Sequence, residues 1–318
     1  MKHSFRVGNH IFSIDAPTSI NLFSLLPSLQ RFSLPPNQKA PLEENLLFSL
    51  SITADETLGG SMTREQRLQI SVPPKEAEEV LTFDWDDADC TISKTNAHYY
   101  IQTSPHRVTS SAEEVDSTWY IRTDLDFKHG TTFLKKDERN GFVMNNFLMM
   151  LYAFNGASKD TLLMHASVIE MNGEGYMFLG KSGTGKSTHT ALWLRHFPGA
   201  LRLNDDNPVV RISPDGQPLV YGSPWSGKTP CYRNAQVSLK GIVRLHQAPY
   251  NKIQREMTVP AFASILPSCS ILKQDKKLYD ALCNVVGKVA QLVPTYHLEC
   301  LPDEAAARLA YDTITKAK

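Results

Sequence analysis

The chain has 318 residues, and at roughly 150 residues per domain this length predicts about two domains. Hydrophobic residues make up 42% of the sequence and charged residues 21%, which excludes an intrinsically disordered or fibrous protein. The 33 basic and 33 acidic residues balance, which argues against a general nucleic-acid coat or a polybasic membrane binder.

Charge is distributed unevenly along the chain. Residues 1–150 contain 14 Lys and Arg against 20 Asp and Glu, whereas residues 151–318 contain 19 against 13. The two parts therefore carry net charges of −6 and +6. A basic half is typical of proteins that bind anionic ligands, and chance scatter over solvated faces is the alternative.

No targeting or membrane segment is predicted. The first 15 residues include Lys2 and Arg6 and contain no apolar run of the kind that a signal peptide requires. The longest apolar stretch, Phe147–Phe154, is much shorter than the roughly 20 residues that cross a bilayer. The five cysteines are scattered and form no Cys-x-x-Cys pair, which favours reduced thiols and a cytoplasmic protein.

The first 135 residues are predicted to be mostly β-structure. Short runs rich in β-branched and aromatic residues alternate with Pro and Gly turn signals. The predicted strands are His10–Ile14, Leu46–Ile52, Leu68–Val72, His98–Thr103 and Thr118–Thr123. The acidic run Asp84–Asp89 lacks the glycine and terminal glutamate of a calcium loop, so a solvated hairpin or strand edge is predicted there.

Near residue 138 the strand-like runs end, and apolar residues begin to recur at helical spacing. Apolar residues in Gly141–Phe154 predict a buried helix. The domain boundary is placed before this helix, which gives a β-rich domain at 1–137 and a second domain at 138–318. Helical spacing returns at Leu278–Val289, and Leu301-Pro302-Asp303-Glu304 predicts the start of a last helix.

The strongest motif is the segment Gly180–Ser187, which fits G-x-x-x-x-G-K-[ST] in full. Its glycines allow successive backbone N–H groups to turn towards phosphate oxygens. Lys186 is predicted to reach the β- and γ-phosphates, and the Ser187 hydroxyl to ligate Mg²⁺. The predicted nucleotide-binding residues are Gly180, Lys181, Ser182, Gly183, Thr184, Gly185, Lys186, Ser187 and Thr188.

The residues around this motif have the required order of strand, loop and helix. Tyr176–Leu179 is an apolar run that predicts a buried strand, and a helix from Ser187 to about His196 would direct its positive end at the phosphates. Upstream, Asn172-Gly173 separates two strand-like runs, which is a strong hairpin signal. An antiparallel hairpin is therefore predicted to lead into the loop, unlike the parallel entry of ordinary phosphate-loop NTPases.

Two carboxylates, Asp205 and Asp206, end the predicted strand Leu201–Asp206. One carboxylate beside the phosphates would hold Mg²⁺, and the other would accept a proton from an attacking hydroxyl. The alternative is a surface Asx turn before Pro208.

A further loop, Tyr221–Lys228, combines Gly, Ser, Pro and Lys and suits a phosphate or an acidic substrate. Its Trp225 would either stack on a ligand or anchor the loop. The predicted substrate residues of this region are Ser226, Gly227, Lys228 and Arg233, the last as a charge clamp. A plain structural turn is the alternative for each of them.

His165, the hairpin, Gly180–Ser187 and Asn204-Asp205-Asp206 together resemble the catalytic domain of bacterial HPr kinase/phosphorylase. They also resemble the nucleotide site of ATP-dependent phosphoenolpyruvate carboxykinase. The resemblance is strongest to a subgroup of HPr-kinase-related proteins in which a loop like residues 224–228 follows. It covers about residues 160–250 and implies a mixed α+β protein. The β-rich N-terminal domain would precede a carboxykinase-like P-loop α/β domain with a helical C-terminus.

The resemblance also implies roles for individual residues. His165 and Asp205 would act at the acceptor hydroxyl, with Lys186 on the phosphates. Ser187 and Asp206 would then lie near Mg²⁺, and the exchanged assignment of the two aspartates stays open. HPr kinases form rings, which implies that this chain also self-associates.

Two departures from these families narrow the prediction. The glycine-rich signature that HPr kinases carry after the acidic pair is missing, and Pro224–Lys228 stands in that region. This argues against HPr as the acceptor and against phosphorolysis. The carboxykinases are longer and need substrate arginines and metal ligands that have no counterpart here.

The predicted function is therefore an ATP- and Mg²⁺-dependent kinase that phosphorylates a hydroxyl of a protein, a peptide or a small molecule. The alternative is a nucleotide-binding regulatory module without significant phosphotransfer. Carboxykinase-like metabolism is the remote third reading. No nucleic-acid or membrane partner is predicted.

Overall fold

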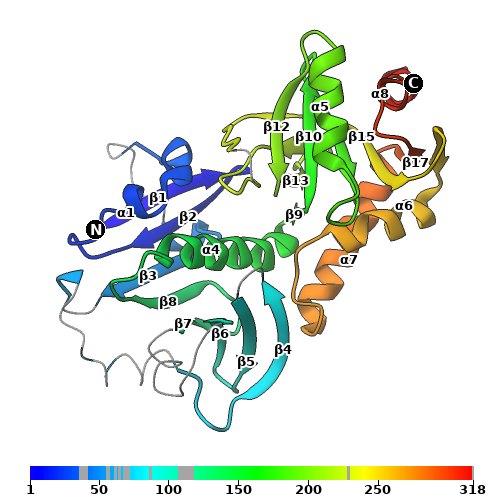
Figure 1. Cartoon of the computed structure of the whole chain (residues 1–318). Helices are drawn as coiled ribbons and strands as arrows, with labels where there is room; N and C mark the ends of the chain where they lie inside the picture. Colours follow the sequence, from blue (N-terminus) through cyan, green and yellow to red (C-terminus); the bar gives the residue numbers. More distant parts are fainter. Residues whose placement is uncertain are drawn as a thin grey trace. The chain divides into compact units, whose positions relative to one another are not determined.

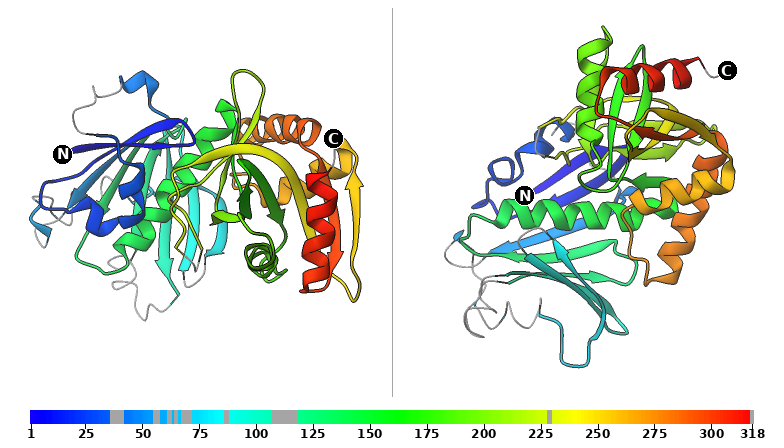
Figure 2. Two further views of the ribbon diagram at one scale, coloured as in Figure 1. Left: turned by 90° about the horizontal axis from the view of Figure 1, so that it is seen from above. Right: turned by 45° about the vertical axis from the view of Figure 1, so that its right-hand side comes forward.

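The computed structural model describes residues 1–35, 42–54, 58–60, 63, 66, 72–85, 88–106, 118–227 and 230–316 (Figures 1 and 2). The protein is a mixed α+β protein with two compact units. One unit comprises Met1–Arg6 and His10–Asn155, and the other comprises Val7–Asn9 and Gly156–Lys318. The predicted strand Leu68–Val72 lies almost wholly outside the described residues.

The first unit is built on a mixed sheet that has eight strands in the described part of the chain. Their order is β1-β2-β3-β8-β7-β6-β5-β4, with parallel pairing of β3 to β2 and to β8. The strands are β1 (Lys2–Val7), β2 (His10–Asp15), β3 (Ser49–Ala54), β4 (Glu78–Trp85), β5 (Ala88–Lys94), β6 (His98–Pro105), β7 (Trp119–Asp124) and β8 (His129–Leu134). Short helical segments are α1 (Leu22–Leu25), η1 (Pro27–Phe32) and η2 (Glu43–Asn45). The predicted β-rich character of this region is confirmed.

The strands that flank the acidic run pair as a hairpin predicts. Strands β4 and β5 are antiparallel, and Asp84 lies opposite Asp89. Asp86 and Asp87 lie outside the described residues.

Helix α4 (Asn140–Gly156) confirms the predicted buried helix but groups with the first unit as far as Asn155. The predicted boundary at residue 137 therefore differs from this grouping by 18 residues. The reason lies in the contacts of the helix, because Asn155 donates a 2.8 Å hydrogen bond to the Phe127 carbonyl. The rings of Phe127 and Phe154 also pack edge to face, with centroids 5.0 Å apart. Local periodicity predicts such a helix without indicating which sheet it covers.

The second unit contains a sheet of nine strands among the residues described. Its main path is β12-β10-β11-β15-β14-β13-β9, and β17 pairs with both β15 and β16. The strands are β9 (Thr161–Leu163), β10 (Ala166–Met171), β11 (Glu174–Leu179), β12 (Leu201–Asp206), β13 (Val209–Ile212), β14 (Pro218–Tyr221), β15 (Gln236–Gln247), β16 (Lys252–Glu256) and β17 (Thr295–Cys300). Only β10, β11 and β12 were expected from the sequence, and the other six strands extend the sheet beyond β11.

Helices cover both faces of this sheet. They are α5 (Lys186–His196), α6 (Thr258–Ile265), α7 (Lys276–Leu292) and α8 (Glu304–Thr315), with short η4 (Ala157–Lys159) and η5 (Leu266–Ser268). Alternate residues of β11 enter opposite cores, so Phe178 packs with α5 and α8 whereas Leu179 packs with α6 and α7. The predicted buried strand is thereby confirmed.

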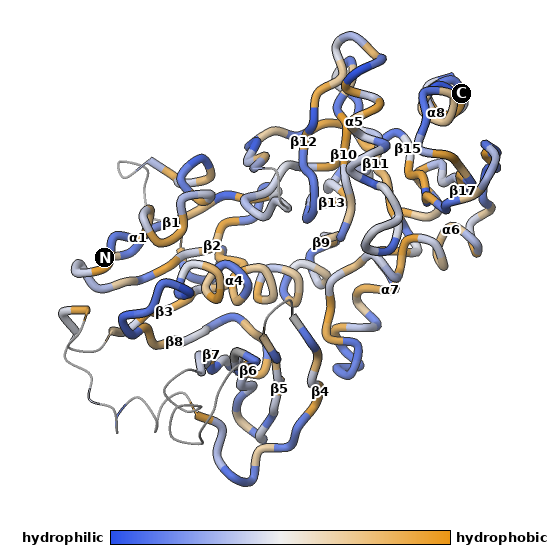
Figure 3. The backbone as a smooth tube through the Cα atoms, viewed as in Figure 1, coloured by the Kyte–Doolittle hydropathy of each residue, from blue (hydrophilic) through white to orange (hydrophobic). Residues whose placement is uncertain are grey.

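The two predicted C-terminal helices are also confirmed. Asp275 and Asp303 cap α7 and α8 by accepting hydrogen bonds from first-turn backbone N–H groups. Figure 3 shows hydrophobic and hydrophilic residues alternating along α7, as expected for a helix with one buried face. In the part of the chain that the structure describes, no helix is long and apolar enough to cross a membrane.

Candidate functional site

The β10–β11 hairpin directly precedes the motif Gly180–Ser187, which is called the phosphate loop from its sequence pattern. Asn172 and Gly173 both have left-handed backbone angles, with φ of 55° and 77°, as a two-residue hairpin turn requires. The strands are antiparallel, with Met171 opposite Glu174. The predicted hairpin is confirmed, and its second strand ends directly before Gly180.

The loop Gly180–Gly185 has the backbone geometry of an anion cradle. Gly183 and Gly185 have φ of 76° and 101°, a region that other residues rarely adopt. The Thr184 hydroxyl and backbone N–H both bond the Lys181 carbonyl, which closes the turn. Helix α5 then begins at Lys186 with no side-chain cap on its first-turn N–H groups. Those N–H groups and the helix dipole together favour a bound anion.

The Lys186 side chain lies inside this loop and is only 8% exposed. Its Nζ lies 2.9 Å from the Gly180 carbonyl oxygen and 3.0 Å from His165 Nε2. Burial lowers the pKa of Lys186, and the charges of Asp206 and Asp205 oppose that shift. A buried cation of this kind gains stability when an anion binds beside it.

The two aspartates have different partners. Asp205 accepts hydrogen bonds at one carboxylate oxygen from Ser167 Oγ at 2.7 Å and from Ser187 Oγ at 3.3 Å. The carboxylate of Asp206 instead lies 3.0 Å from His165 Nδ1. His165 thus contacts Asp206 and Ser187 contacts Asp205, which is the grouping of the exchanged assignment that the sequence left open. The exposed fraction of the side chain also differs, at 30% for Asp206 and 6% for Asp205.

Strand pairing explains this arrangement. Strand β12 pairs antiparallel with β10, which places Asp205 opposite Ser167 and Asp206 opposite Ala166. His165 directly precedes β10, and its backbone N–H is held by the Ser268 carbonyl at 2.6 Å. The start of β10 and the end of β12 thus lie at the sheet edge where β11 enters the phosphate loop (Figure 1).

The predicted substrate loop lies next to the aspartates. Ser226 forms a bridge with Asp206, and the Gly227 N–H donates to the Asp205 carbonyl at 3.1 Å. A Cβ at Gly227 would lie 2.8 Å from that carbonyl oxygen, so the close approach requires glycine. Trp225 is 2% exposed and therefore anchors the loop instead of offering a stacking face.

Of the other two predicted substrate residues, the structure describes only Arg233. Lys228 lies outside the described residues. The Arg233 guanidinium pairs with Glu170 at 2.7 Å and donates to the Arg202 carbonyl at 3.1 Å. These contacts give Arg233 a structural partner, which argues against the predicted charge clamp.

The sequence predicted no role for the polar residues that support the acidic pair, although Asn204 stands beside the two aspartates in the segment that carries the resemblance. Asn204 is fully buried, accepts the Asp206 backbone N–H at 3.0 Å, and donates to Ser223 Oγ at 3.1 Å. Asn207 donates to the Asp206 carboxylate at 2.8 Å. The run Asn204–Asn207 stands in the sequence as a clue, whereas nothing near Ser167 indicates its contact with Asp205.

His189 offers a test of the packing behind the loop. It is buried in α5, accepts a 3.3 Å hydrogen bond from Trp193 Nε1, and has its pKa lowered by burial from 6.5 to about 4. The unfolded chain therefore binds the proton first as the pH falls, so stability is present above pH 6.5 and is lost towards pH 4. Between pH 7 and pH 4, protonation of His189 should lower the free energy of unfolding by about 3 kcal/mol.

The measurement is urea denaturation at pH 7 and at pH 4, compared with a His189→Gln variant that keeps an acceptor for Trp193. The wild-type protein should lose more stability than the variant between the two pH values. Equal losses would contradict a neutral, buried His189.

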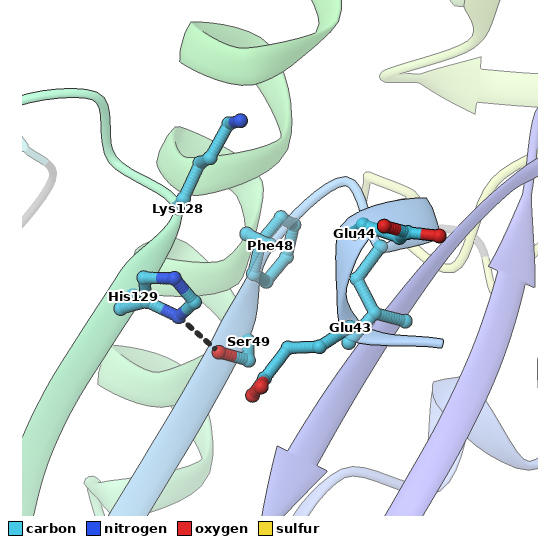
Figure 4. A pocket seen from close by; sticks show the side chains of 7 residues that line it. Glu43, Glu44, Phe48, Ser49, Lys128 and His129 are labelled. Atoms are coloured by element: carbon cyan, nitrogen blue, oxygen red, sulfur yellow. Dashed lines mark hydrogen bonds between the residues drawn. The ribbon is translucent and has the colours of Figure 1, made fainter. Parts of the chain in front are cut away.

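A pocket of about 160 Å³ in the first unit is also lined by several polar side chains (Figure 4). Glu43, Glu44, Lys128 and His129 surround it, and Ser49 Oγ lies 2.9 Å from His129 Nδ1. Its acidic and basic side chains are exposed, so packing does not hold them in the fixed positions that a catalytic or binding site requires. The phosphate loop is therefore the stronger candidate site.

No protein-family model matches the chain, and no curated protein matches its sequence.

Proposed function

We propose that this chain is an ATP- and Mg²⁺-dependent kinase that transfers the γ-phosphate of ATP to a hydroxyl group. The observation that carries the proposal is the line of contacts from Lys186 through His165 to Asp206, at the mouth of a complete phosphate loop. The buried Lys186 ammonium beside an anion cradle is suited to bind the phosphates of ATP. The Asp206 carboxylate, linked to Lys186 through His165, is suited to accept the proton of the hydroxyl that is phosphorylated. The resemblance of these segments to HPr kinases supports the same function.

The residues present fit a magnesium ion. Within the described residues, no group of three or more His, Cys, Asp or Glu side chains is arranged to hold a metal. Mg²⁺ in nucleotide sites, however, needs only one or two carboxylates together with the substrate phosphates. Asp205 with the neighbouring Ser187 hydroxyl meets that need, and an ion held there would neutralise phosphate charge.

The protein groups bind the phosphates, accept the proton of the acceptor hydroxyl and position the carboxylate that accepts it. The amides of Gly183–Ser187 and the Lys186 ammonium hold and orient the phosphates. Asp206 is the more exposed carboxylate, so it is the one that an acceptor hydroxyl can reach and the one that takes its proton. His165 accepts a hydrogen bond from Lys186 at Nε2 and donates from Nδ1 to Asp206, which fixes the carboxylate. This assignment exchanges the predicted roles of the two aspartates.

The first test is nucleotide binding by Lys186→Ala. ATP or ADP with Mg²⁺ should stabilise the wild-type protein, by about 2.7 kcal/mol at 100 times the dissociation constant. Removal of the Lys186 ammonium should abolish most of that stabilisation, measured as the shift in melting temperature. The matched control is Lys181→Ala, because the exposed Lys181 contributes its backbone carbonyl to the loop.

A folded wild-type protein that shows no shift at millimolar nucleotide would contradict the proposal. If binding is present, incubation with γ-labelled ATP, Mg²⁺ and a lysate of the source organism identifies the labelled acceptor. Nucleotide binding without any labelled product would instead favour a regulatory module.

A further inference from the structure

A cavity adjoins the phosphate loop in the second unit. It lies on the β15 side of β11, whereas β12 with the two aspartates lies on the other side. It has a volume of about 380 Å³, within the range of small-molecule sites. Gly183, Thr184 and Gly185 form one wall, and the first turns of α5 form another. The remaining wall comes from the end of β15 with Ala248 and from the end of β17 with the two residues that follow it.

The cavity is lined mainly by apolar side chains. They are Leu192 from α5, Leu245 from β15, Ala248 directly after β15, and Leu301 and Pro302 after β17. The polar side chains of the lining are Thr184, Thr188, His189 and Gln247. The apolar walls suit a flat, weakly polar ring, because burial of apolar surface on both faces is favourable. They do not suit a second phosphate or a charged peptide, since no described lysine or arginine lines the cavity.

The polar groups of the outer wall are already engaged within the protein. The Ala248 N–H donates to the Cys300 carbonyl at 3.1 Å, and the Leu301 N–H donates to Asn251 Oδ1 at 2.8 Å. Pro302 has no N–H group. The Gln247 amide donates to the Gly183 carbonyl at 3.1 Å, which ties this wall to the phosphate loop.

We propose that this cavity holds the nucleoside of the bound nucleotide, by apolar contact and without hydrogen-bond readout of the base edge. The proposal rests on the proposed nucleotide-binding function, and it names the segment Ala248 with Cys300–Pro302 as the base site. Because the wall shares Gly183–Gly185 with the phosphate loop, one nucleotide spans both. Adenine and guanine nucleotides should then bind with affinities within about tenfold, since discrimination needs unpaired polar groups in the site.

Cys300 supplies the probe, since its thiol lines the cavity and is partly exposed. The wild-type protein is alkylated near pH 9, because burial raises the pKa of this thiol, and each cysteine is followed by mass spectrometry. Reactions contain Mg²⁺ with ADP, GDP or tripolyphosphate. ADP and GDP should slow alkylation of Cys300 at least fivefold, and tripolyphosphate, which lacks a nucleoside, should not. The partly exposed Cys231 and Cys283, which do not line the cavity, are internal controls.

A variant that fills the cavity gives a second, independent readout. Ala248→Trp should weaken ADP binding at least tenfold and leave tripolyphosphate binding unchanged, both measured from melting temperatures. ADP that stabilises the protein without protecting Cys300 or responding to Ala248→Trp would place the base elsewhere and overturn this inference alone. A preference above 100-fold between ADP and GDP would overturn recognition by apolar contact. If neither ADP nor tripolyphosphate stabilised the protein, that result would contradict both the proposed function and this inference.

Discussion

Asp206→Asn is expected to lower phosphotransfer by roughly 10²–10⁴-fold while nucleotide binding survives. The substitution keeps the size of the side chain but only one of its two acceptor oxygens, because His165 lies 3.0 Å from Oδ1 of Asp206 and Asn207 donates to Oδ2 at 2.8 Å. It removes the negative charge and the basicity that would take a proton from the acceptor. The measurement is transfer from γ-labelled ATP to the identified acceptor, or the slow ATP hydrolysis of the protein alone.

Asp205→Asn is the matched comparison at the neighbouring residue. Its acceptor oxygen would still receive the hydroxyls of Ser167 and Ser187, but a hard cation would lose a charged ligand. The Mg²⁺ concentration needed for half-maximal activity should therefore rise, with a smaller loss at saturating Mg²⁺. If Asp205→Asn abolished turnover at all Mg²⁺ concentrations and Asp206→Asn changed only the Mg²⁺ requirement, the two roles would be reversed. If neither variant changed turnover, the acidic pair would be a structural turn.

Gly222→Ala is expected to destabilise the second unit by about 3 kcal/mol. A Cβ at Gly222 would lie 1.9 Å from the Arg233 carbonyl oxygen and 3.2 Å from the Leu203 carbonyl oxygen. Both neighbours are backbone atoms, so neither can rotate away as a side chain would. The loop that holds Gly227 against Asp205 would have to move, and phosphotransfer should fall together with stability.

The control for this prediction is Gly287→Ala in the interior of α7, where a Cβ would meet no atom within 4 Å. That substitution should raise the unfolding free energy by about 0.5–1 kcal/mol, because alanine favours the helix more than glycine does. Urea denaturation followed by circular dichroism measures both variants. A Gly222→Ala protein as stable as the wild type would show that the loop tolerates displacement.

The phosphate loop illustrates how far sequence alone determines this site. Glycine at positions 183 and 185 permits left-handed backbone angles that other side chains disfavour, so the motif specifies its own turn. Asn172-Gly173 likewise encodes a two-residue turn between strands, and capping residues such as Asp303 mark where helices begin. These features depend on neighbours in the chain, and their positions were predictable for that reason.

The partners of the acidic pair depend on contacts between distant segments. Ser167 and Asp205 are 38 residues apart, and only the pairing of β10 with β12 brings their side chains within 2.7 Å. Adjacent residues of a strand point to opposite faces, so Asp205 and Asp206 necessarily acquire different partners. Which partner each receives follows from strand register, and no local pattern encodes that register.

Local sequence patterns thus predicted the loop Gly180–Gly185, its hairpin, the helix that follows and the residue types that meet in the site. The tertiary structure decided that His165 contacts Asp206, that Trp225 is buried, and that Arg233 pairs with Glu170. It also decided that β15 and the segment after β17 enclose a cavity beside the loop. Turns and caps are encoded by residues a few positions apart, whereas these contacts arise from packing between strands and loops that are remote in sequence.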